Sequence, residues 1–458
     1  MLNRDRATWA LAMILSILCL VTPAIWNGFP LLEWDTGGYL ARWYDHTLVI
    51  NRAVPYGLFL NVGSFFAFWP VLIVQSVLTI WVLALMLRAH GFANRPWLLT
   101  GMIAVLSALT TLPWLTSILL TDIFAGLAVF AAYLLMLHAA KFTRWEKIGL
   151  FLLLAFSAST HSATLAVCGG LLIVAAVVAW LDRKRIAVAR LAAPALAVVL
   201  SVAFIFGGNY LVAKKLAWTP GGFGIAFGRM LQDGIVKKYL DAHCPEAGLV
   251  LCRYKDRLPQ NADQFFWHDP VFEKTPGGFE GLGPEMERIV LAATAEYPLL
   301  QIETAAIATA RQLVYVRTGE GVENTTWHTY GVIHDRLPEV VPAMEAARQQ
   351  QKQSISFTGI NAVHYPLALL SLALLPVICL LGWLGRLPAS FAELGMTCIL
   401  ALLGNAMVCG IVSNPHDRYG ARLVWIASFV ALLALTQAVA QARRARVRSL
   451  PNAEPLFS

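Results

Sequence analysis

Long runs of hydrophobic residues occupy most of this chain, and polar residues are concentrated between them. Ten of these runs approach or reach the length of about 17–25 residues at which an apolar helix crosses a bilayer. They lie near 8–28, 70–87, 97–112, 117–138, 147–160, 162–181, 190–212, 362–385, 390–412 and 421–440. This pattern predicts an all-α polytopic membrane protein with about ten transmembrane helices.

The composition agrees with a membrane protein. The chain has 458 residues, of which 58% are hydrophobic and only 14% are charged, whereas soluble domains are about 25% charged. The first apolar run, from Trp9 to Trp26, is long for a signal peptide, and no small-x-small cleavage site follows it. Because basic residues at helix ends explain the net charge of +8, we expect a lipid bilayer as partner and no nucleic acid.

Basic residues are distributed unequally between the two sides of the predicted bundle. Sixteen fall in one set of alternate connections, and four fall in the short connections opposite. The sixteen are Arg4, Arg6, Arg88, Arg95, Lys141, Arg144, Lys147, Arg183, Lys184, Arg185, Arg190, Arg386, Arg443, Arg444, Arg446 and Arg448, and the four are Arg42, Arg52, Arg418 and Arg422. Because cytoplasmic connections are rich in Lys and Arg, both termini are predicted to be cytoplasmic, which requires an even number of helices.

The spacing of the apolar runs divides the chain into three parts. Residues 1–212 hold seven predicted helices, residues 213–356 form a large outer region, and residues 357–458 hold three further helices and a basic tail. The first outer connection, residues 29–57, is also long and is rich in aromatic and charged residues. The stretch Tyr56–Trp69 is predicted to lie as a helix along the membrane surface and to end where Pro70 begins the second span.

We expect the large outer region to have two different halves. Residues 213–284 contain six prolines and frequent glycines, which predicts mostly irregular structure. Residues 285–318 are predicted to be helical, with an interruption at Pro298. This second half has an amphipathic face that we expect to pack on the bilayer or on the bundle, formed by Met286, Ile289, Val290 and Ala293.

Two of the seven cysteines, Cys244 and Cys252, lie in this polar outer region, while the other five lie within apolar runs. Extracytoplasmic compartments oxidise pairs of thiols, so we predict a disulfide between Cys244 and Cys252. A zinc site is a weaker interpretation, because His243 is adjacent but no fourth ligand follows with a recognisable spacing.

Polar and ionisable side chains form four short clusters, all on the predicted outer side. Such groups are costly near a bilayer and are therefore candidates for function. The clusters are Glu33-Trp34-Asp35 with Tyr39, Thr121-Asp122, Ser159-Thr160-His161-Ser162, and His416-Asp417-Arg418-Tyr419 with Arg422. A transporter would more often place its ionisable groups at mid-bilayer. The common sidedness favours a site at one membrane face.

Each cluster also has a purely structural interpretation. Asp35 and Asp122 are suited to cap helices that begin near them. His161 could be a turn histidine, and Arg418 and Arg422 could anchor the chain to lipid headgroups. Taken together, however, two carboxylates and two arginines on one face suit a phosphate-bearing lipid and an acceptor that needs a general base.

The order of these features resembles the GT-C superfamily of integral membrane glycosyltransferases, which includes protein mannosyltransferases and lipid A aminoarabinose transferases. In that superfamily the first outer loop holds an acidic residue soon after helix one, often in an Asp-Glu pair followed by an aromatic residue. Asp35 and Tyr39 match this position, with Thr36 in place of the second acid. The segment from Asn414 to Tyr419 is similar to the Arg-Tyr element that several members carry before a late helix.

This resemblance implies transfer of a sugar from a polyprenyl-phosphate donor to an extracytoplasmic acceptor, in a bacterial inner membrane with the active site facing the periplasm. Asp35 would deprotonate or orient the acceptor hydroxyl, and Asp122 would position the sugar or help to hold a divalent metal. Arg418 and Arg422 would neutralise the phosphate. The other expected substrate-binding residues are Tyr39, His161, His416 and Tyr419. No cofactor is assigned, because one carboxylate is a poor divalent site by itself.

Two other classes of function stay open. A flippase for lipid-linked precursors, or an assembly factor for the cell envelope, would share this topology, although no predicted span carries Lys or Arg in its interior. An acyltransferase that uses His161 ranks lowest, because no carboxylate is adjacent to that histidine in the sequence.

Overall fold

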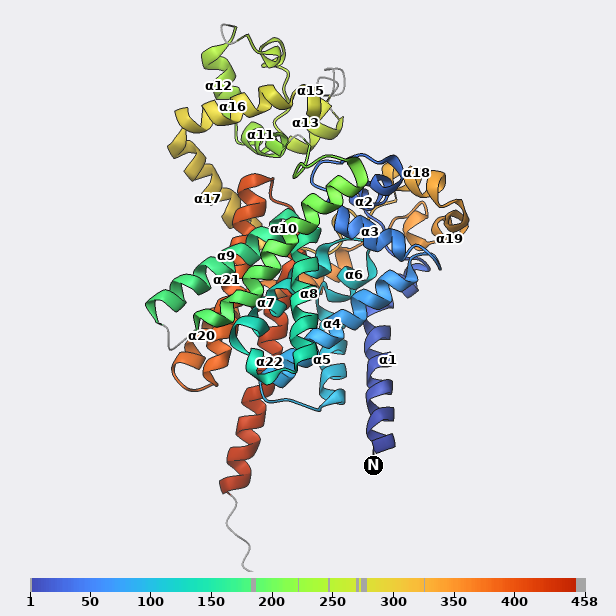
Figure 1. Ribbon diagram of the computed structural model, residues 1–458, viewed down its shortest axis with the longest axis vertical. Coiled ribbons are helices and arrows are strands. Elements are labelled where there is room, and N and C mark those ends of the chain that lie inside the picture. The colour runs from blue at the N-terminus through green and yellow to red at the C-terminus, as the bar shows by residue number, and fades with distance from the viewer. Residues whose placement is uncertain are drawn as a thin grey trace, which may run out of the picture.

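The computed structural model describes residues 2–182, 187–220, 222–245, 248–268, 272, 278–324 and 326–449. All regular elements in these ranges are helices, and the one β-bridge joins Leu31 to Ile118. The helices form a bundle with a separate group of short helices above one end (Figure 1). The all-helical class predicted from the apolar runs is therefore confirmed for the described part of the chain.

Each of the ten predicted spans coincides with a helix of the bundle. These helices are α1 Leu2–Asn27, α4 Trp69–Ala89, α5 Pro96–Leu109, α7 Asp122–Leu137, α8 Arg144–Thr160, α9 Ser162–Leu181, α10 Ala192–Ala213, α20 Thr358–Trp383, α21 Ala389–Val412 and α22 Asp417–Ser449. Among the described residues, seven of them are long and apolar enough to cross a membrane, namely α1, α4, α9, α10, α20, α21 and α22. The chain is thus a multi-pass helical membrane protein, and the count of ten spans stays a prediction.

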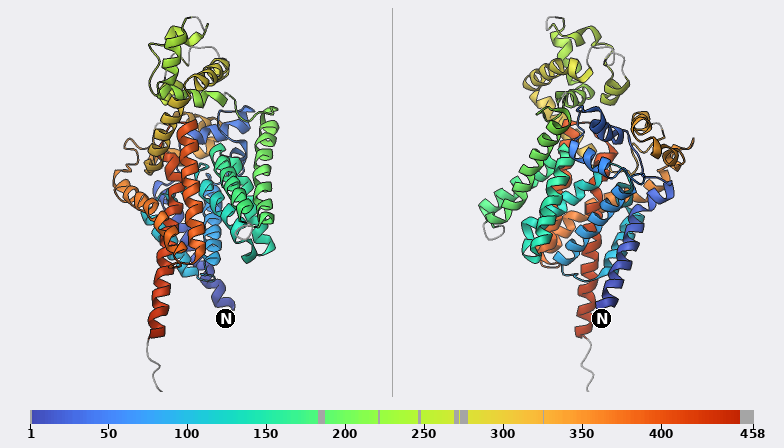
Figure 2. Two further views of the ribbon diagram at one scale, coloured as in Figure 1. Left: turned by 90° about the vertical axis from the view of Figure 1, so that its left-hand side faces the viewer. Right: turned by 45° about the vertical axis from the view of Figure 1, so that its right-hand side comes forward.

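The group of short helices above the bundle is called the cap here, and it comprises the described residues between 222 and 296. Its helices are α11 Gly222–Gln232, α12 Ile235–His243, η3 Val250–Tyr254, α13 Ala262–His268, α15 Gly278–Gly281 and α16 Gly283–Glu296. The end of the bundle below the cap is called the cap side, and the opposite end, where α1 begins and α22 ends, is called the tail side (Figures 1 and 2).

The cap has a hydrophobic core of its own, so the prediction of mostly irregular structure before residue 285 was wrong. Ile235 and Phe265 are completely buried in this core, as is Ile289 of α16. The amphipathic face of α16 therefore packs inside the cap against α11 and α12, and neither on the bilayer nor on the bundle. Prolines between short apolar segments separate helices here without preventing them. A disulfide joins Cys244 to Cys252 at the edge of this core.

Helix α17, Pro298–Val314, leads from the cap down to the bundle, where it packs along α21. The predicted interruption is confirmed, because α16 ends at Glu296 and Pro298 is the first residue of α17. Arg229 of the cap is buried and holds this junction together: its Nε donates to Gly410 O at 2.8 Å and its Nη2 donates to Thr304 O at 3.2 Å.

Short helices cover the cap side of the bundle. They are α2 Trp34–Asp45, α3 Val54–Val62, α6 Leu112–Ser117, α18 Trp327–Arg336 and α19 Val341–Glu345. Helix α6 belongs to the connection between α5 and α7, and the others belong to the two long connections. Part of the stretch Tyr56–Trp69 is helical, as α3, which ends at Val62 before the turn that precedes Pro70; its position along the membrane surface stays a prediction. A Cβ on Gly57 of α3 would lie 2.4 Å from Tyr39 O, so this glycine allows α3 to lie directly on α2.

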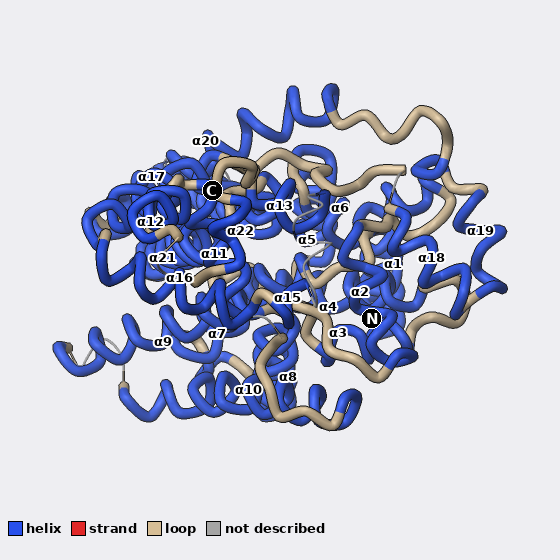
Figure 3. The backbone as a smooth tube through the Cα atoms, turned by 90° about the horizontal axis from the view of Figure 1, so that it is seen from above, coloured by secondary structure: helices blue, strands red, loops and turns tan. Residues whose placement is uncertain are grey.

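The remaining helices and connections complete the two faces of the bundle. Four short 3-10 helices lie outside the cap, namely η1 Ala139–Lys141, η2 Val188–Leu191, η4 Pro338–Val340 and η5 Arg348–Gln350. Seen along the bundle axis, α8, α9 and α10 occupy one edge and α20 the opposite edge (Figure 3). The connections after α4 and α20, which carry Arg95 and Arg386, lie toward the tail side (Figure 1), as the charge pattern predicts.

Candidate functional site

Arg418, at the start of α22, lies at the centre of a cluster of carboxylates on the cap side. Its Nη1 is 2.9 Å from Glu33 Oε1 and also 2.9 Å from Asp35 Oδ2, and its Nε is 3.0 Å from Asp122 Oδ2. The side chains of Arg418 and Asp35 are only 13% and 18% exposed, and Asp122 is 3% exposed. Two acidic residues of the first connection and one at the start of α7 therefore converge on one guanidinium group.

Local helix geometry fixes the two acidic residues of the first connection. The N-cap of α2 is Glu33: its Oε2 accepts from Asp35 N at 2.6 Å, and Thr36 Oγ1 accepts from Glu33 N at 3.2 Å. This is a capping box, which satisfies backbone donors at a helix start. The capping role considered for Asp35 thus belongs to Glu33, and the Asp35 carboxylate is left to meet Arg418.

Asp122 is not a helix cap either. It is the first residue of α7, and the N-cap position is held by Thr121, whose side chain makes no capping bond. One oxygen of Asp122, Oδ2, accepts from Arg418, while Oδ1 is buried without a hydrogen-bond partner in the described part of the chain. A buried carboxylate oxygen without a partner is costly, and such atoms mark places where a ligand can contribute a donor.

Helix α18 packs on α2 and makes hydrogen bonds to the backbone around Glu33 and Asp35. Thr329 Oγ1 donates to the backbone oxygens of Glu33 and Trp34, at 2.7 and 3.0 Å, and accepts from Gly37 N at 2.9 Å. A Cβ on Gly37 would lie 2.7 Å from Thr329 Cα, so only glycine permits this close approach. Helix α18 of the large connection therefore helps to position the acidic residues at 33 and 35.

Arg52 is a member of this site that the sequence did not single out. It forms an ion pair with Asp35 Oδ1, and its Nη1 donates to Ile50 O at 2.9 Å. Its Nε is buried without a partner among the described residues. Tyr39, one turn after Asp35, is completely enclosed beside these charges and meets Tyr56 edge-on at 5.1 Å. Arg52 belongs to no motif of its connection, so only the fold reveals its role.

The two acidic residues of the first connection have opposite electrostatic environments. Burial raises the pKa of Glu33 to about 7, and the nearby Arg418 offsets only part of that effect. Burial also opposes ionisation of Asp35, but the adjacent Arg52 and Arg418 guanidinium groups outweigh it and hold the pKa of Asp35 well below its usual value. Asp35 is thus ionised at neutral pH, whereas Glu33 can take up a proton near neutral pH.

The structure gives the two predicted phosphate-binding arginines different environments. Arg418 already contacts three carboxylates, so few of its donors remain for a phosphate. Arg422 is 1% exposed, and its hydrogen-bond acceptors are neutral: Asn405 Oδ1, at 2.6 Å from Nη2 and 3.2 Å from Nε, and Cys409 Sγ. No carboxylate pairs with Arg422 in the described ranges. A buried guanidinium without a counter-charge is suited to bind an anion.

His161 lies beside this unpaired charge, at the N-cap of α9. Its Nδ1 accepts from Ala163 N at 3.1 Å, so the neutral ring carries its proton on Nε2 as a donor. Burial, together with the positive charges of Arg422 and Arg418, holds the pKa of His161 well below its usual value. The neutral imidazole at the positive end of a helix adds a second donor group for an anion.

His416 is engaged by acidic residues of two other segments, which links the cap to the site. Its Nδ1 is 2.7 Å from Glu320 Oε1, and its Nε2 is 3.3 Å from Asp263 Oδ2 of the cap. Burial disfavours the imidazolium, but the hydrogen bonds to Asp263 and Glu320 outweigh it and raise the pKa of His416 to about 10. Glu320 Oε2 also accepts from Arg418 N at 2.6 Å, so this histidine positions the start of α22.

Two further predictions concern Tyr419 and a divalent metal. Tyr419 lies between the two arginines in sequence, with its backbone oxygen accepting from Asn405 Nδ2 at 2.7 Å and its ring 5.9 Å from the Arg422 guanidinium. Within the described ranges, no group of three or more His, Cys, Asp or Glu side chains is arranged to hold a metal ion. Glu33, Asp35 and Asp122 are instead arranged around a guanidinium group.

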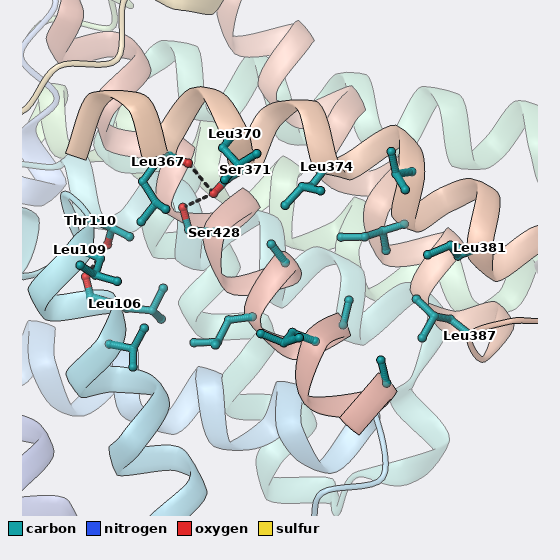
Figure 4. Close-up of a pocket in the computed structure, with 18 residues that line it drawn as sticks. Leu106, Leu109, Thr110, Leu367, Leu370, Ser371, Leu374, Leu381, Leu387 and Ser428 are labelled. Atoms are coloured by element: carbon teal, nitrogen blue, oxygen red, sulfur yellow. Dashed lines mark hydrogen bonds between the residues drawn. The ribbon is translucent and has the colours of Figure 1, made fainter. Parts of the chain in front are cut away.

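Two cavities lie in the bundle away from this cluster. One has a volume of about 460 Å³ and lies between α5, α20 and α22, with an apolar wall (Figure 4). The polar groups in that wall are satisfied, because Ser371 Oγ donates to Leu367 O at 2.8 Å and shares a hydrogen bond of 2.9 Å with Ser428 Oγ. The other has a volume of about 520 Å³ and lies between α1, α5, α6 and α20.

Comparison of this chain with models of protein families, with curated proteins and with solved structures gave no match. A functional interpretation therefore depends on the chemistry of the site, because a fold by itself does not define an activity. The features that require an explanation are the buried cluster around Arg418 and the unpaired charge of Arg422 beside it.

Proposed function

We propose that this protein is a GT-C-type glycosyltransferase that moves a sugar from a polyprenyl-phosphate donor to an acceptor hydroxyl on the cap side of the membrane. The observation that carries the proposal is the convergence of Glu33, Asp35 and Asp122 on Arg418, with Arg422 unpaired nearby. Such a reaction needs carboxylates for the acceptor and a positive group for the phosphate, and both are present at one end of the bundle.

The carboxylate pair acts on the acceptor. Asp35 is the most exposed of the three acidic residues, so it accepts a hydrogen bond from the incoming hydroxyl. As the hydroxyl oxygen bonds to the anomeric carbon, its proton passes to the Glu33–Asp35 pair, where Glu33 has the pKa of about 7 that a general base requires. Both carboxylates lie 2.9 Å from the same Arg418 nitrogen, which places them side by side.

Arg422, which lies one turn after Arg418 in α22, acts on the sugar donor. When the bond between the anomeric carbon and the phosphate oxygen breaks, the electron pair stays with the phosphate. Arg422 and the Nε2 donor of His161 stabilise this leaving group, while Arg418 keeps the carboxylates in place. Asp122, with one oxygen free of partners, holds a hydroxyl of the transferred sugar. The cap above the site selects the acceptor.

We also infer how the protein is oriented in the membrane. The cap side faces the periplasm of a bacterial inner membrane, and both termini lie in the cytoplasm, because the connections rich in Lys and Arg lie toward the tail side. The Cys244–Cys252 disulfide of the cap agrees with an oxidising compartment.

Replacing Arg422 with Ala should weaken the binding of polyprenyl phosphate by about tenfold to a hundredfold, the effect of losing one hydrogen bond to a charged group. The measurement is titration of the purified protein with polyprenyl phosphate in detergent. Arg422→Lys should retain part of the affinity, and Arg336→Ala, which removes an exposed arginine paired with Asp45, is the matched control. If Arg422→Ala binds as tightly as the control, the donor phosphate does not lie at Arg422.

A further inference from the structure

The larger of the two cavities lies just below the cap side of the membrane-spanning helices. Trp26 at the end of α1 and Trp114 of α6 line it, together with Ile360 and Val363 of α20. Tryptophan is enriched where the hydrocarbon meets the headgroups, so this cavity lies at the level of one membrane interface. Its volume of about 520 Å³ is more than three times the ~150 Å³ of an apolar cavity that holds one benzene ring. Its volume is therefore large enough to take up part of a hydrocarbon chain.

A positive group contacts one of the residues that line this cavity. The Arg348 guanidinium lies over the Trp26 ring at 5.2 Å from its centroid, and Arg348 Nε donates to Trp26 O at 2.8 Å. Arg348 is exposed, and it makes no ion pair with a carboxylate in the part of the chain that the structure describes. The stacking fixes the guanidinium directly beside the apolar cavity, with its two terminal nitrogens available as donors.

The wall of the cavity also has an unsatisfied polar group. Ser107 Oγ is buried and has no hydrogen-bond partner among the described residues, although a serine in a helix can bond to its own backbone. The other hydroxyl of the wall, Thr22 Oγ1, donates to Leu18 O at 2.7 Å. Ser107 can therefore donate to an ester oxygen of a bound lipid. A hydrocarbon chain alone has no such acceptor.

We propose that this cavity and Arg348 form a binding site for an anionic phospholipid of the bilayer. One hydrocarbon chain lies in the cavity, the ester region lies near Ser107, and the headgroup phosphate contacts the Arg348 guanidinium. Basic residues beside a cleft between membrane helices are typical of sites for anionic lipids. The site is separate from the carboxylate cluster and does not depend on the proposed transferase activity.

The test uses the full-length protein, purified in detergent and depleted of lipid, with bound lipid counted by native mass spectrometry. Phosphatidylglycerol should bind at least about tenfold more tightly than phosphatidylcholine with the same chains, which corresponds to about 1.4 kcal/mol. Arg348→Ala should remove this preference, while Arg257→Ala, which changes an exposed arginine of the cap, should retain it. Ala108→Phe, which fills the cavity, should weaken both lipids, and Val105→Phe, which faces the other cavity, should weaken neither.

Four outcomes would overturn the proposal. Equal affinity for the two phospholipids would remove the role of Arg348, as would identical behaviour of Arg348→Ala and Arg257→Ala. Unchanged binding in Ala108→Phe would show that the chain lies elsewhere. Displacement of phosphatidylglycerol by a lower concentration of polyprenyl phosphate, lost in Arg348→Ala, would show that the site takes the sugar donor and not a bilayer phospholipid.

Discussion

Asp35→Asn should reduce the rate of sugar transfer by about 10²- to 10⁴-fold, the range for removing a group that handles the reacting proton. Asn retains the shape of the side chain, but its single amide oxygen can accept from only one of Arg418 and Arg52. It also removes the negative charge that attracts the acceptor hydroxyl proton. Affinity for polyprenyl phosphate should be nearly unchanged, since the phosphate contacts are assigned to Arg422 and His161. The measurement is incorporation of labelled sugar by membranes that contain each variant.

The matched control for this experiment is Asp45→Asn. Asp45 is the last residue of the same helix and pairs with the exposed Arg336, so its change should leave the transfer rate unaltered. The pH dependence separates the two acidic residues of the site. Because burial raises the pKa of Glu33 to about 7, the rate should rise as pH increases through 7 and Glu33 loses its proton. Glu33→Gln should abolish this rise, and a rise that persists in that variant would remove Glu33 from the proton-transfer step.

Arg418→Ala should be the most destabilising single change at the site, by about 3–5 kcal/mol in the free energy of unfolding, the usual cost of removing one partner from a buried ion pair. Without Arg418, the carboxylates of Glu33, Asp35 and Asp122 lose the positive charge that they share. The measurement is thermal unfolding of the purified variants in detergent. Arg336→Ala, which breaks an exposed ion pair, should cost at most about 1 kcal/mol.

Acidic pH should partly restore the Arg418→Ala variant. A carboxyl group whose pKa is raised in the folded state favours folding at low pH, and this contribution is lost as pH rises through the folded-state pKa. Glu33 has such a raised pKa, and removal of Arg418 raises it further, since Arg418 is the main group that lowers it. The variant should therefore be closer to wild type at pH 6 than at pH 8. Equal destabilisation at both pH values would show that repulsion among the carboxylates is not the cause.

The membrane-spanning helices could be predicted from the sequence because lipid requires long apolar runs, and little else produces them. The alternation of basic connections then placed Asp35, Asp122 and Arg418 on one side of the membrane. Their direct contact depends on how α2, α7 and α22 pack, which periodicity does not report. The sequence therefore singled out Asp35, Asp122 and Arg418, and the structure adds that Arg418 binds the two carboxylates.

Other parts could not be predicted because their causes are tertiary. Arg52 belongs to no motif, and its role follows only from the packing of α2 against the following turn. Glu33 was noted beside Asp35, but its capping bonds and its raised pKa depend on the buried helix start. In the cap, the prolines indicated irregular structure, whereas apolar residues such as Ile235 and Phe265 form a small core that short helices share. His416 acquires its acidic partners, Asp263 and Glu320, from distant segments.

The most direct measurement of the central claim is a comparison of envelope glycolipids and polysaccharides in three strains. The gene is deleted in one strain, and the deletion is complemented with the wild-type chain or with Asp35→Asn in the other two, at equal protein levels. The account predicts that one sugar decoration is lost in the deletion strain, restored by the wild-type chain and not restored by Asp35→Asn. Identical glycans in the deletion strain and in the strain complemented with the wild-type chain would contradict a glycosyltransferase. Full restoration by Asp35→Asn would contradict the role of the carboxylate cluster.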